Sequence, residues 1–246
     1  SPRWAARGDT VFLTATADEG YELSVLSVSD RNGEAITLDN EGGGVYSFTM
    51  PVGRVTVTAA FSKTVNTLPF TDVHPGDWFY DPVCFVYSQG LMTGTSATMF
   101  EPNTHLTRAM LVAVLHRIEG SPAASGSDFT DVADNDWYAT AVNWAANVGV
   151  VNGFDDGTFQ PNAAITREQL AAILMNYAQY KGQDVSARAT LDIYNDATAI
   201  SGWANDVMSW AVAEGLLTGV TNDQLQPQGN ATRAQVAAIL QRFLSE

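Results

Sequence analysis

The sequence predicts an α+β protein with two parts, a small antiparallel β module followed by three helical repeats. Three observations predict this fold class. The first 62 residues alternate β-branched and polar residues in short segments that Gly- and Asn-rich turns separate. From Phe70 onward the apolar residues follow helical spacing. One pattern of tryptophan, glycine, proline and Thr-Arg pairs then occurs in three copies.

The β module is expected to consist of short strands joined by turns. In the first of them, Val11, Leu13 and Ala15 fall on one face because strand side chains alternate. The turn signals include Asn32-Gly33 and the run from Asn40 to Gly44. The expected strands are 10–17, 21–28, 35–38, 45–49 and 54–61.

The three copies align without a gap on Trp78, Trp137 and Trp203. The other matched positions are Phe85, Trp144 and Trp210; Gly90, Gly149 and Gly215; Gly94, Gly153 and Gly219; Pro102, Pro161 and Pro227; and the pairs that end in Arg108, Arg167 and Arg233. Chance does not produce this spacing, so we treat the repeat as established.

Each copy predicts two helices. The first is expected to start at the tryptophan, with Asp77 or Asp136 as N-cap, and to end at the glycine twelve residues later, in a left-handed C′ position. The second starts at Thr107, Thr166 or Thr232. Its apolar residues recur at i, i+3, i+4 and i+7, which predicts one buried face and a pseudo-threefold central bundle of the three second helices. The alanines at positions 113, 172 and 238 would let these helices approach closely.

The Thr-Arg pairs combine a helix start with an unexpected charge. Thr with Gln169 or Gln235 three residues later forms a capping box, whereas Met110 cannot complete one. Arginine at the first helical position opposes the helix dipole, so three copies of it suggest a use. Two uses remain open: an internal salt bridge to Asp72, Asp131 or Asp196, or binding of an external anion at the helix N-terminus.

Composition excludes several classes of function. The formal charge is 12 − 27 = −15, and such an acidic chain does not suit nucleic acid, which requires clustered Lys and Arg. No segment has the apolar length of a membrane span. Cys84 lies among apolar residues and is expected to be a buried, inert thiol. The opening residues do not read as a signal peptide, and we expect the chain to be part of a larger mature protein.

Residues 70–246 resemble S-layer homology (SLH) domains. The resemblance rests on F70-T-D-V, D77-W-F and L106-T-R in the first copy, and on F129-T-D-V, G153-F-D-D-G-T-F-Q-P and I165-T-R-E-Q in the second. In the third copy it rests on Y194-N-D and A231-T-R-A-Q. The β module resembles, more loosely, the small β repeats that act as spacers in bacterial surface proteins.

The resemblance implies a fold and a ligand. SLH domains usually come in threes, fold as a pseudo-trimer around a three-helix core, and anchor surface proteins non-covalently to secondary polymers of the cell wall. In many members the ligand is a terminal N-acetylmannosamine with a pyruvate ketal, held in grooves between repeats. The signature T-R-A-E keeps its Thr and Arg here but not its Glu.

The residues that would bind this ligand follow from the same match. Arginine would take the ketal carboxylate and the tryptophans would form an apolar wall. Because the second loop fits the family best, sites with Arg167 and that loop are expected to be active and one groove degraded. An Arg167→Ala variant is then expected to keep its fold and lose wall binding. The candidate ligand-binding residues are Arg108, Arg167, Arg233, Trp78, Trp137, Trp203, Gly94, Gly153, Gly219, Asp155 and Asp156.

Other candidate sites have weaker support. His74, His105 and His116 occur only in the first copy, so we expect no metal site, and residues 131–136 lack the glycine and distal glutamate of a calcium loop. Core packing is the expected role of the three aligned tryptophans. No catalytic constellation recurs, so we expect no enzyme in this chain and no cofactor.

These observations define one main hypothesis and one alternative. The expected domains are a β spacer at 1–66 and SLH repeats at 67–122, 123–186 and 187–246. The main hypothesis is an extracellular cell-wall anchor that binds an anionic polysaccharide linked to peptidoglycan. It is a monomer with an internal pseudo-trimer, has no nucleic-acid partner and does not insert into a membrane. The alternative is a self-association scaffold whose repeated arginines form internal salt bridges.

Overall fold

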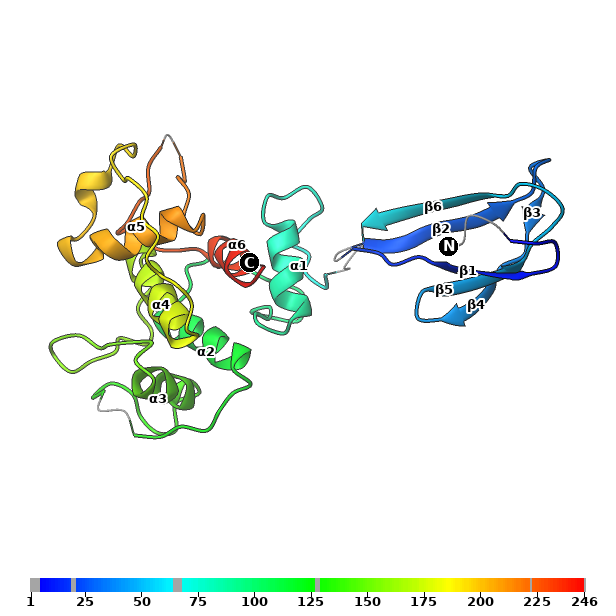
Figure 1. Cartoon of the computed structure of the whole chain (residues 1–246). Coiled ribbons are helices and arrows are strands. Elements are labelled where there is room, and N and C mark those ends of the chain that lie inside the picture. The colour runs from blue at the N-terminus through cyan, green and yellow to red at the C-terminus, as the bar shows by residue number, and fades with distance from the viewer. Residues whose placement is uncertain (1–4, 19–20, 64–67, 127–128, 222, 246) are drawn as a thin grey trace. The chain divides into compact units, whose positions relative to one another are not determined.

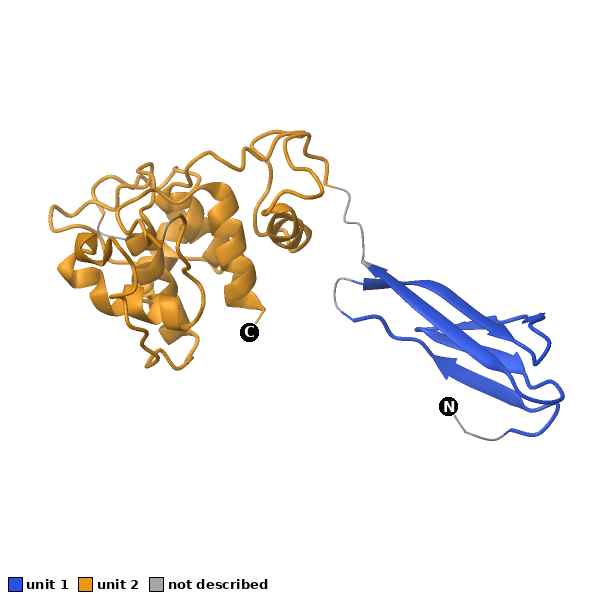
Figure 2. Ribbon diagram, turned by 90° about the horizontal axis from the view of Figure 1, so that it is seen from above, with its two compact units in different colours: residues 1–67 blue, residues 68–246 orange. Residues whose placement is uncertain are grey.

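A computed structural model describes residues 5–18, 21–63, 68–126, 129–221 and 223–245. The chain forms two compact units, residues 1–67 and residues 68–246 (Figure 2). Each unit has its own hydrophobic core.

The first unit is made of antiparallel β-sheet. Its strands form two three-stranded sheets, with the orders β1-β5-β4 and β3-β2-β6 (Figure 1). The core between them contains Val11, Leu13, Val28 and Phe48. The strands are β1 Thr10–Thr14, β2 Tyr21–Ser29, β3 Ala35–Ile36, β4 Asp39–Gly42, β5 Val45–Thr49 and β6 Thr56–Lys63.

The alternation in β1 confirms the expected inward face. Val11 and Leu13 are buried, whereas Phe12 between them is exposed. Val11 pairs with Phe48 of β5 and Leu13 pairs with Tyr46. Some details of the prediction are wrong. The expected strand 10–17 ends at Thr14, and the expected strand 54–61 is shifted to Thr56–Lys63. The expected strand 35–38 shortens to two residues, and β4 was interpreted as a turn because its residues are polar and glycine-rich.

In its described residues, the second unit contains six α-helices, two from each sequence copy (Figure 1). They are α1 Tyr80–Ser88, α2 Arg108–Ile118, α3 Ala139–Asn147, α4 Arg167–Tyr180, α5 Asn205–Ala213 and α6 Arg233–Leu244. Two short 3-10 helices, Ala197–Ala199 and Gly202–Ala204, precede α5. Each first helix packs on the second helix of a different copy: α3 on α2, α5 on α4 and α1 on α6.

The second helices begin as predicted. Thr107, Thr166 and Thr232 are the N-caps, and each side chain accepts a hydrogen bond from the backbone N–H three residues later. Capping boxes with Gln169 and Gln235 are complete in α4 and α6. In α2, where Met110 takes the glutamine position, only the threonine half is present.

The first helices end as predicted but start later. Gly90, Gly149 and Gly215 have φ between +67° and +76°, the left-handed conformation expected just after a helix. The aspartates before the tryptophans are not N-caps. Asp77 instead accepts a hydrogen bond from the His74 N–H, and α1 begins three residues after Asp77 at Tyr80.

Backbone hydrogen bonds join the three copies in a closed ring just before the second helices. Leu106 donates its N–H to the carbonyl of Ala231, Ala231 donates to Ile165, and Ile165 donates to Leu106, at 2.9–3.0 Å. All three residues are fully or almost fully buried. The ring fixes the N-terminal ends of α2, α4 and α6 relative to one another. Among the described residues, no helix is both long and apolar enough to span a bilayer.

Candidate functional site

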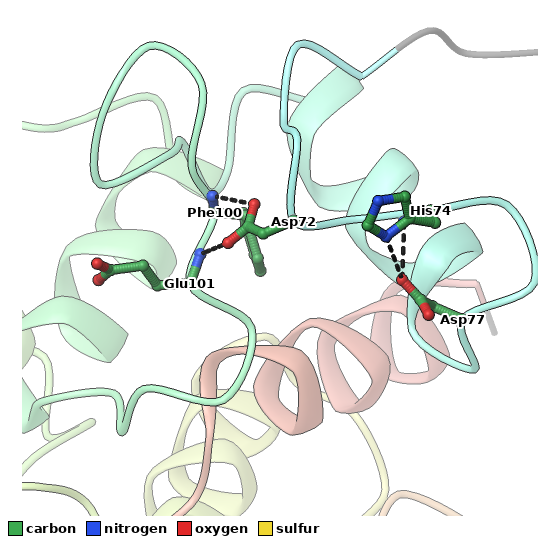
Figure 3. Close-up of polar contacts among 5 residues, drawn as sticks. All are labelled: Asp72, His74, Asp77, Phe100 and Glu101. Atoms are coloured by element: carbon green, nitrogen blue, oxygen red, sulfur yellow. Dashed lines mark hydrogen bonds and ion pairs between the residues drawn. The ribbon is translucent and has the colours of Figure 1, made fainter.

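In each copy an aspartate holds the turn that precedes the second helix. Asp72 accepts hydrogen bonds from the backbone N–H groups of Phe100 and Glu101 at 2.9 and 2.7 Å (Figure 3). Asp131 and Asp196 make the same pair of bonds in the other copies. The second residue of each turn has a positive φ although it is not glycine, so these two bonds stabilise a strained backbone.

The three arginines reach into the loop of the next copy. The Nε of Arg108 donates to the Phe159 carbonyl at 2.8 Å, and its guanidinium lies 4.7 Å from the centre of the Phe159 ring. Arg167 donates from Nε to Leu225 and from Nη2 to Thr218, at 2.6 and 2.9 Å. The third copy repeats this arrangement, because Arg233 donates to Phe100 and Thr93.

The salt-bridge alternative for the arginines is therefore wrong. All three are buried, with only 4–6% of each residue exposed. Among the described residues, no carboxylate lies at ion-pair distance from them. The aspartates proposed as their partners accept backbone N–H groups instead, and the arginines donate to backbone carbonyls.

Burial has an electrostatic cost for these cations. It lowers the pKa of Arg108 to about 10, although the charge of Asp131 opposes the shift. Burial also lowers the pKa of Arg167 to about 10, and the positive charge of Arg242 contributes to the shift. Since both values lie well above neutral pH, the guanidinium groups remain charged at pH 7.

The tryptophans that align the three copies are exposed. Trp78, Trp137 and Trp203 keep 63%, 63% and 58% of their surface accessible, so the expected core-packing role is wrong. Phe79 and Tyr138, the next residues after Trp78 and Trp137, stack edge-on against these indoles. The rings are therefore held at the surface rather than drawn into the core.

Three grooves combine these elements, and each draws on all three copies. The Arg108 groove, of about 510 Å³, contains Arg108, Gly153, Gln169, Ala172, Asn176 and Trp203. The Arg167 groove, of about 300 Å³, contains Arg167, Gly219, Gln235, Ala238, Arg242 and Trp78. The Arg233 groove, of about 180 Å³, contains Arg233, Gly94, Met110, Ala113, Arg117 and Trp137. In each groove the arginine, the loop with its helix, and the tryptophan come from different copies.

The structure divides the residues of the predicted site among different grooves. It places arginine, tryptophan and loop glycine together, but it separates Arg167 from the second loop, which lies in the Arg108 groove. The alanines line the grooves. Among the described residues, the second helices pack chiefly on first helices and not on one another. Asp155 also lines the Arg108 groove. Asp156 does not line it, and instead accepts hydrogen bonds from the backbone and hydroxyl of Thr158.

Sequence reasoning missed one position of each groove. Arg117, Asn176 and Arg242 donate side-chain hydrogen bonds to the carbonyls of Leu91, Val150 and Leu216 at 2.8–3.2 Å. Each lies nine residues after the arginine of its Thr-Arg pair. That shared spacing on one helix was a readable signal, but a polar residue on a helix is usually interpreted as solvated.

Two of the loop glycines are required by close packing. A Cβ on Gly153 would lie 2.4 Å from the Phe129 ring, and one on Gly94 would lie 2.5 Å from the Phe70 ring. Around Gly219 the nearest atoms would be 3.6 Å away. The third loop is thus the one of the three in which glycine is not sterically required.

The remaining candidates serve the fold. His116 bonds to the Pro122 carbonyl, Cys84 is buried, and Asp136 accepts the Ala133 N–H in a turn. No group of three or more His, Cys, Asp or Glu residues within the described part of the chain is arranged to hold a metal ion.

The chain is similar to segments of much longer proteins. An endoglucanase of Bacillus sp. (strain KSM-635) is 35% identical over 179 residues, which cover 73% of this chain and 19% of that protein. The exoglucanase XynX of Acetivibrio thermocellus is 30% identical over 92% of this chain and 21% of its own length. A cellulosome-anchoring protein of Acetivibrio thermocellus is 26% identical over 62% of this chain and 35% of its own length. The chain therefore spans about a fifth to a third of these relatives.

Family models account for both units. The model of the S-layer homology domain matches residues 69–109, 128–171 and 193–237, more than half of the chain. The model of the divergent InlB B-repeat domain matches residues 1–65. These matches confirm the resemblance found in the sequence. The chain belongs to the S-layer homology domain family, whose members are cell-wall anchoring modules of the bacterial cell surface, and it carries a β repeat ahead of its three SLH matches.

Proposed function

We propose that this chain binds a secondary cell-wall polysaccharide in the grooves between its repeats and so tethers a larger protein to the cell wall. The observation that carries the proposal is the recurrence of one lining in three places. An exposed tryptophan, a buried arginine and a loop with a glycine meet in each groove, although each comes from a different copy. Core packing alone does not require exposed indoles.

The ligand class follows from the chemistry of the lining. An indole face of this exposure suits the apolar face of a sugar ring. A guanidinium group offers charge-assisted hydrogen bonds to a carboxylate, such as that of a pyruvate ketal. The chain as a whole carries −15, so an anionic polymer would be held by local pockets and not by a general field.

The proposal includes the architecture. We infer a monomer with three SLH repeats, at 67–122, 123–186 and 187–246, in a pseudo-threefold arrangement around the second helices, and a β spacer at 1–66. The ring of backbone hydrogen bonds and the packing of α3 on α2, α5 on α4 and α1 on α6 support this arrangement. This part of the protein would anchor and not catalyse. Catalytic activity of the kind named for two of the relatives would belong to other parts of those longer proteins.

Co-sedimentation with purified cell-wall sacculi tests the proposal. The chain is expected to sediment with intact sacculi and to remain in solution after the secondary polymer has been removed. As a control, purified polymer added in increasing amounts should compete with the sacculi for the chain and reduce sedimentation. Equal sedimentation with extracted sacculi would rule out the polymer as the ligand.

A further inference from the structure

The three grooves share one kind of lining, but the Arg108 groove differs from the other two in its charged residues. The Arg167 groove contains two arginines, Arg167 and Arg242, and no carboxylate among its described lining residues. The Arg108 groove contains one arginine together with Asp155 and Glu168. In that groove Asn176 takes the place that Arg242 has in the other.

The two arginines of the Arg167 groove influence each other. The positive charge of Arg242 contributes, after burial, to the lowered pKa of Arg167. Asp196 and Tyr194 oppose this effect of Arg242 on Arg167, whereas the nearby charges that act on Arg108 and Arg233 come from carboxylates alone. Two like charges without a lining carboxylate disfavour the empty groove, and an anion would relieve their repulsion.

Both arginines are also held in place before any ligand arrives. Arg167 donates to Leu225 and Thr218, and Arg242 donates to Leu216 from Nη1. These bonds use part of each guanidinium and leave further N–H groups, since the group carries five donors. A preorganised pair of this kind loses little conformational entropy on binding.

The carboxylates of the Arg108 groove act in the opposite sense. Glu168 is 5% exposed and accepts hydrogen bonds from the backbone and hydroxyl of Ser201, at 3.1 and 2.8 Å. It is therefore fixed beside the groove and cannot turn away from an approaching anion. The first and third copies have alanine at the equivalent helix position, Ala109 and Ala234.

We propose that the three grooves are not equivalent, and that Arg242, Asn176 and Glu168 set their charge selectivity. The Arg167 groove takes polymer units with two negative charges, and the Arg108 groove takes neutral or singly charged units. This inference rests on the proposed function for the identity of the polymer, but the ranking of the grooves by anion affinity does not. The Arg233 groove also has two arginines but has the smallest volume of the three. Its anion affinity is therefore expected to lie between those of the other two grooves.

Each groove has its own reporter. Trp78 lies in the Arg167 groove and Trp203 in the Arg108 groove. The test is a titration of the full chain, ¹⁵N-labelled at tryptophan, with sodium sulfate as dianion and sodium acetate as monoanion at constant ionic strength. The indole N–H resonance of Trp78 is expected to shift at about tenfold lower sulfate concentration than that of Trp203, because one extra charged donor contributes roughly this factor. With acetate, the concentrations needed to shift the Trp78 and Trp203 resonances should differ less than with sulfate.

Two exchange variants provide matched controls. Arg242→Asn should raise the sulfate concentration needed at Trp78 about tenfold and leave Trp203 unchanged. Asn176→Arg should lower the concentration needed at Trp203. Both should fold, since asparagine and arginine already occupy this position in different copies and donate to equivalent carbonyls. Equal sulfate responses of the two indoles, or an Arg242→Asn variant with an unchanged Trp78 response, would overturn the proposal.

A second arm separates this inference from the proposed function. Purified secondary polymer is titrated in the same way, before and after its carboxylates are reduced to alcohols. Reduction should weaken the Trp78 response more than the Trp203 response. If the polymer shifts neither resonance while sulfate ranks the grooves as expected, the proposed function fails and the charge ranking stands. If the polymer shifts both and reduction affects both equally, the assignment of charged units to the Arg167 groove fails.

Discussion

At the level of single residues, the arginines of the Thr-Arg pairs have a structural as well as a ligand-facing role. Each guanidinium closes the contact between one copy and the loop of the next, through hydrogen bonds that replace the expected salt bridges. The expectation that Arg167→Ala keeps its fold stays a prediction, to which these bonds add an expected loss of stability. The exposed tryptophans, which make fewer contacts with the core, are the better positions at which to test binding.

Arg167→Ala is expected to lower the free energy of unfolding of the second unit by about 2–3 kcal/mol, because the carbonyls of Leu225 and Thr218 lose charged donors. Trp78→Ala, at a side chain that is mostly exposed, should change it by less than about 0.5 kcal/mol. Urea denaturation followed by far-UV circular dichroism measures both. Equal stabilities of the two variants would contradict the structural role of Arg167.

Gly153 and Gly219 form a matched pair for a test of loop packing. Gly153→Ala should destabilise the second unit by about 1–3 kcal/mol, because its Cβ would overlap the Phe129 ring and the Thr158 carbonyl. Gly219→Ala should be close to neutral, because its Cβ would make only ordinary van der Waals contacts, at 3.6 Å. Thermal unfolding of the two variants provides the comparison. A neutral Gly153→Ala would show that the loop adapts to a side chain.

At the level of helices and strands, local patterns were predictable and long-range ones were not. The starts of α2, α4 and α6 followed from threonine capping, and the ends of the first helices from Gly90 and its counterparts. The position of the tryptophans did not follow, because an aromatic residue beside a helix is usually buried. Which loop each arginine contacts depends on how the three copies pack in the closed ring. A local sequence pattern does not carry this information.

The incomplete cap of α2 can be repaired. Met110→Gln would give the Thr107 backbone N–H the side-chain acceptor that Gln169 and Gln235 supply in α4 and α6. The variant is expected to gain about 0.5–1 kcal/mol of stability. Differential scanning calorimetry measures the change. Gln235→Met, the reverse exchange in the third copy, should lose a similar amount. A loss of stability in Met110→Gln, or a gain in Gln235→Met, would refute the capping argument.

The end of α2 is tied to α4 by a charged contact. Glu119 accepts hydrogen bonds from the hydroxyl of Tyr177 at 2.5 Å and from Nζ of Lys181 at 2.8 Å. Burial acts to raise the pKa of Glu119, but the bonds from Lys181 and Tyr177 outweigh it and the pKa is lowered. A carboxyl whose pKa is lower in the folded state stabilises the fold above its unfolded pKa. That contribution is lost as the pH falls through the folded pKa.

Glu119→Gln should therefore destabilise the second unit at pH 7 by about 1–2 kcal/mol. The difference from the unaltered chain should shrink as the pH falls below about 4.5, where the unfolded carboxyl is protonated. Denaturant unfolding at pH 7, 5 and 3 measures it. A difference that is the same at all three pH values would contradict the role of the ionised carboxylate.

At the level of the whole second unit, closure of the ring makes the three copies interdependent. No groove is complete in one copy or in two, since the arginine, the loop and the tryptophan always come from three. The ring of hydrogen bonds among Leu106, Ile165 and Ala231 fixes this geometry in the core. Binding is therefore expected to require that all three copies are folded, and the tryptophans offer a way to remove binding without loss of the fold.

Isothermal titration calorimetry of purified secondary cell-wall polymer into the full chain tests the central claim most directly. The unaltered chain is expected to bind. Each single exchange, Trp78→Ala, Trp137→Ala or Trp203→Ala, should remove the contribution of one groove, and the triple exchange should abolish binding while thermal unfolding stays within about 2 °C of the unaltered chain. Binding of the polymer by the triple variant with undiminished affinity would contradict the assignment of the grooves as the anchoring site.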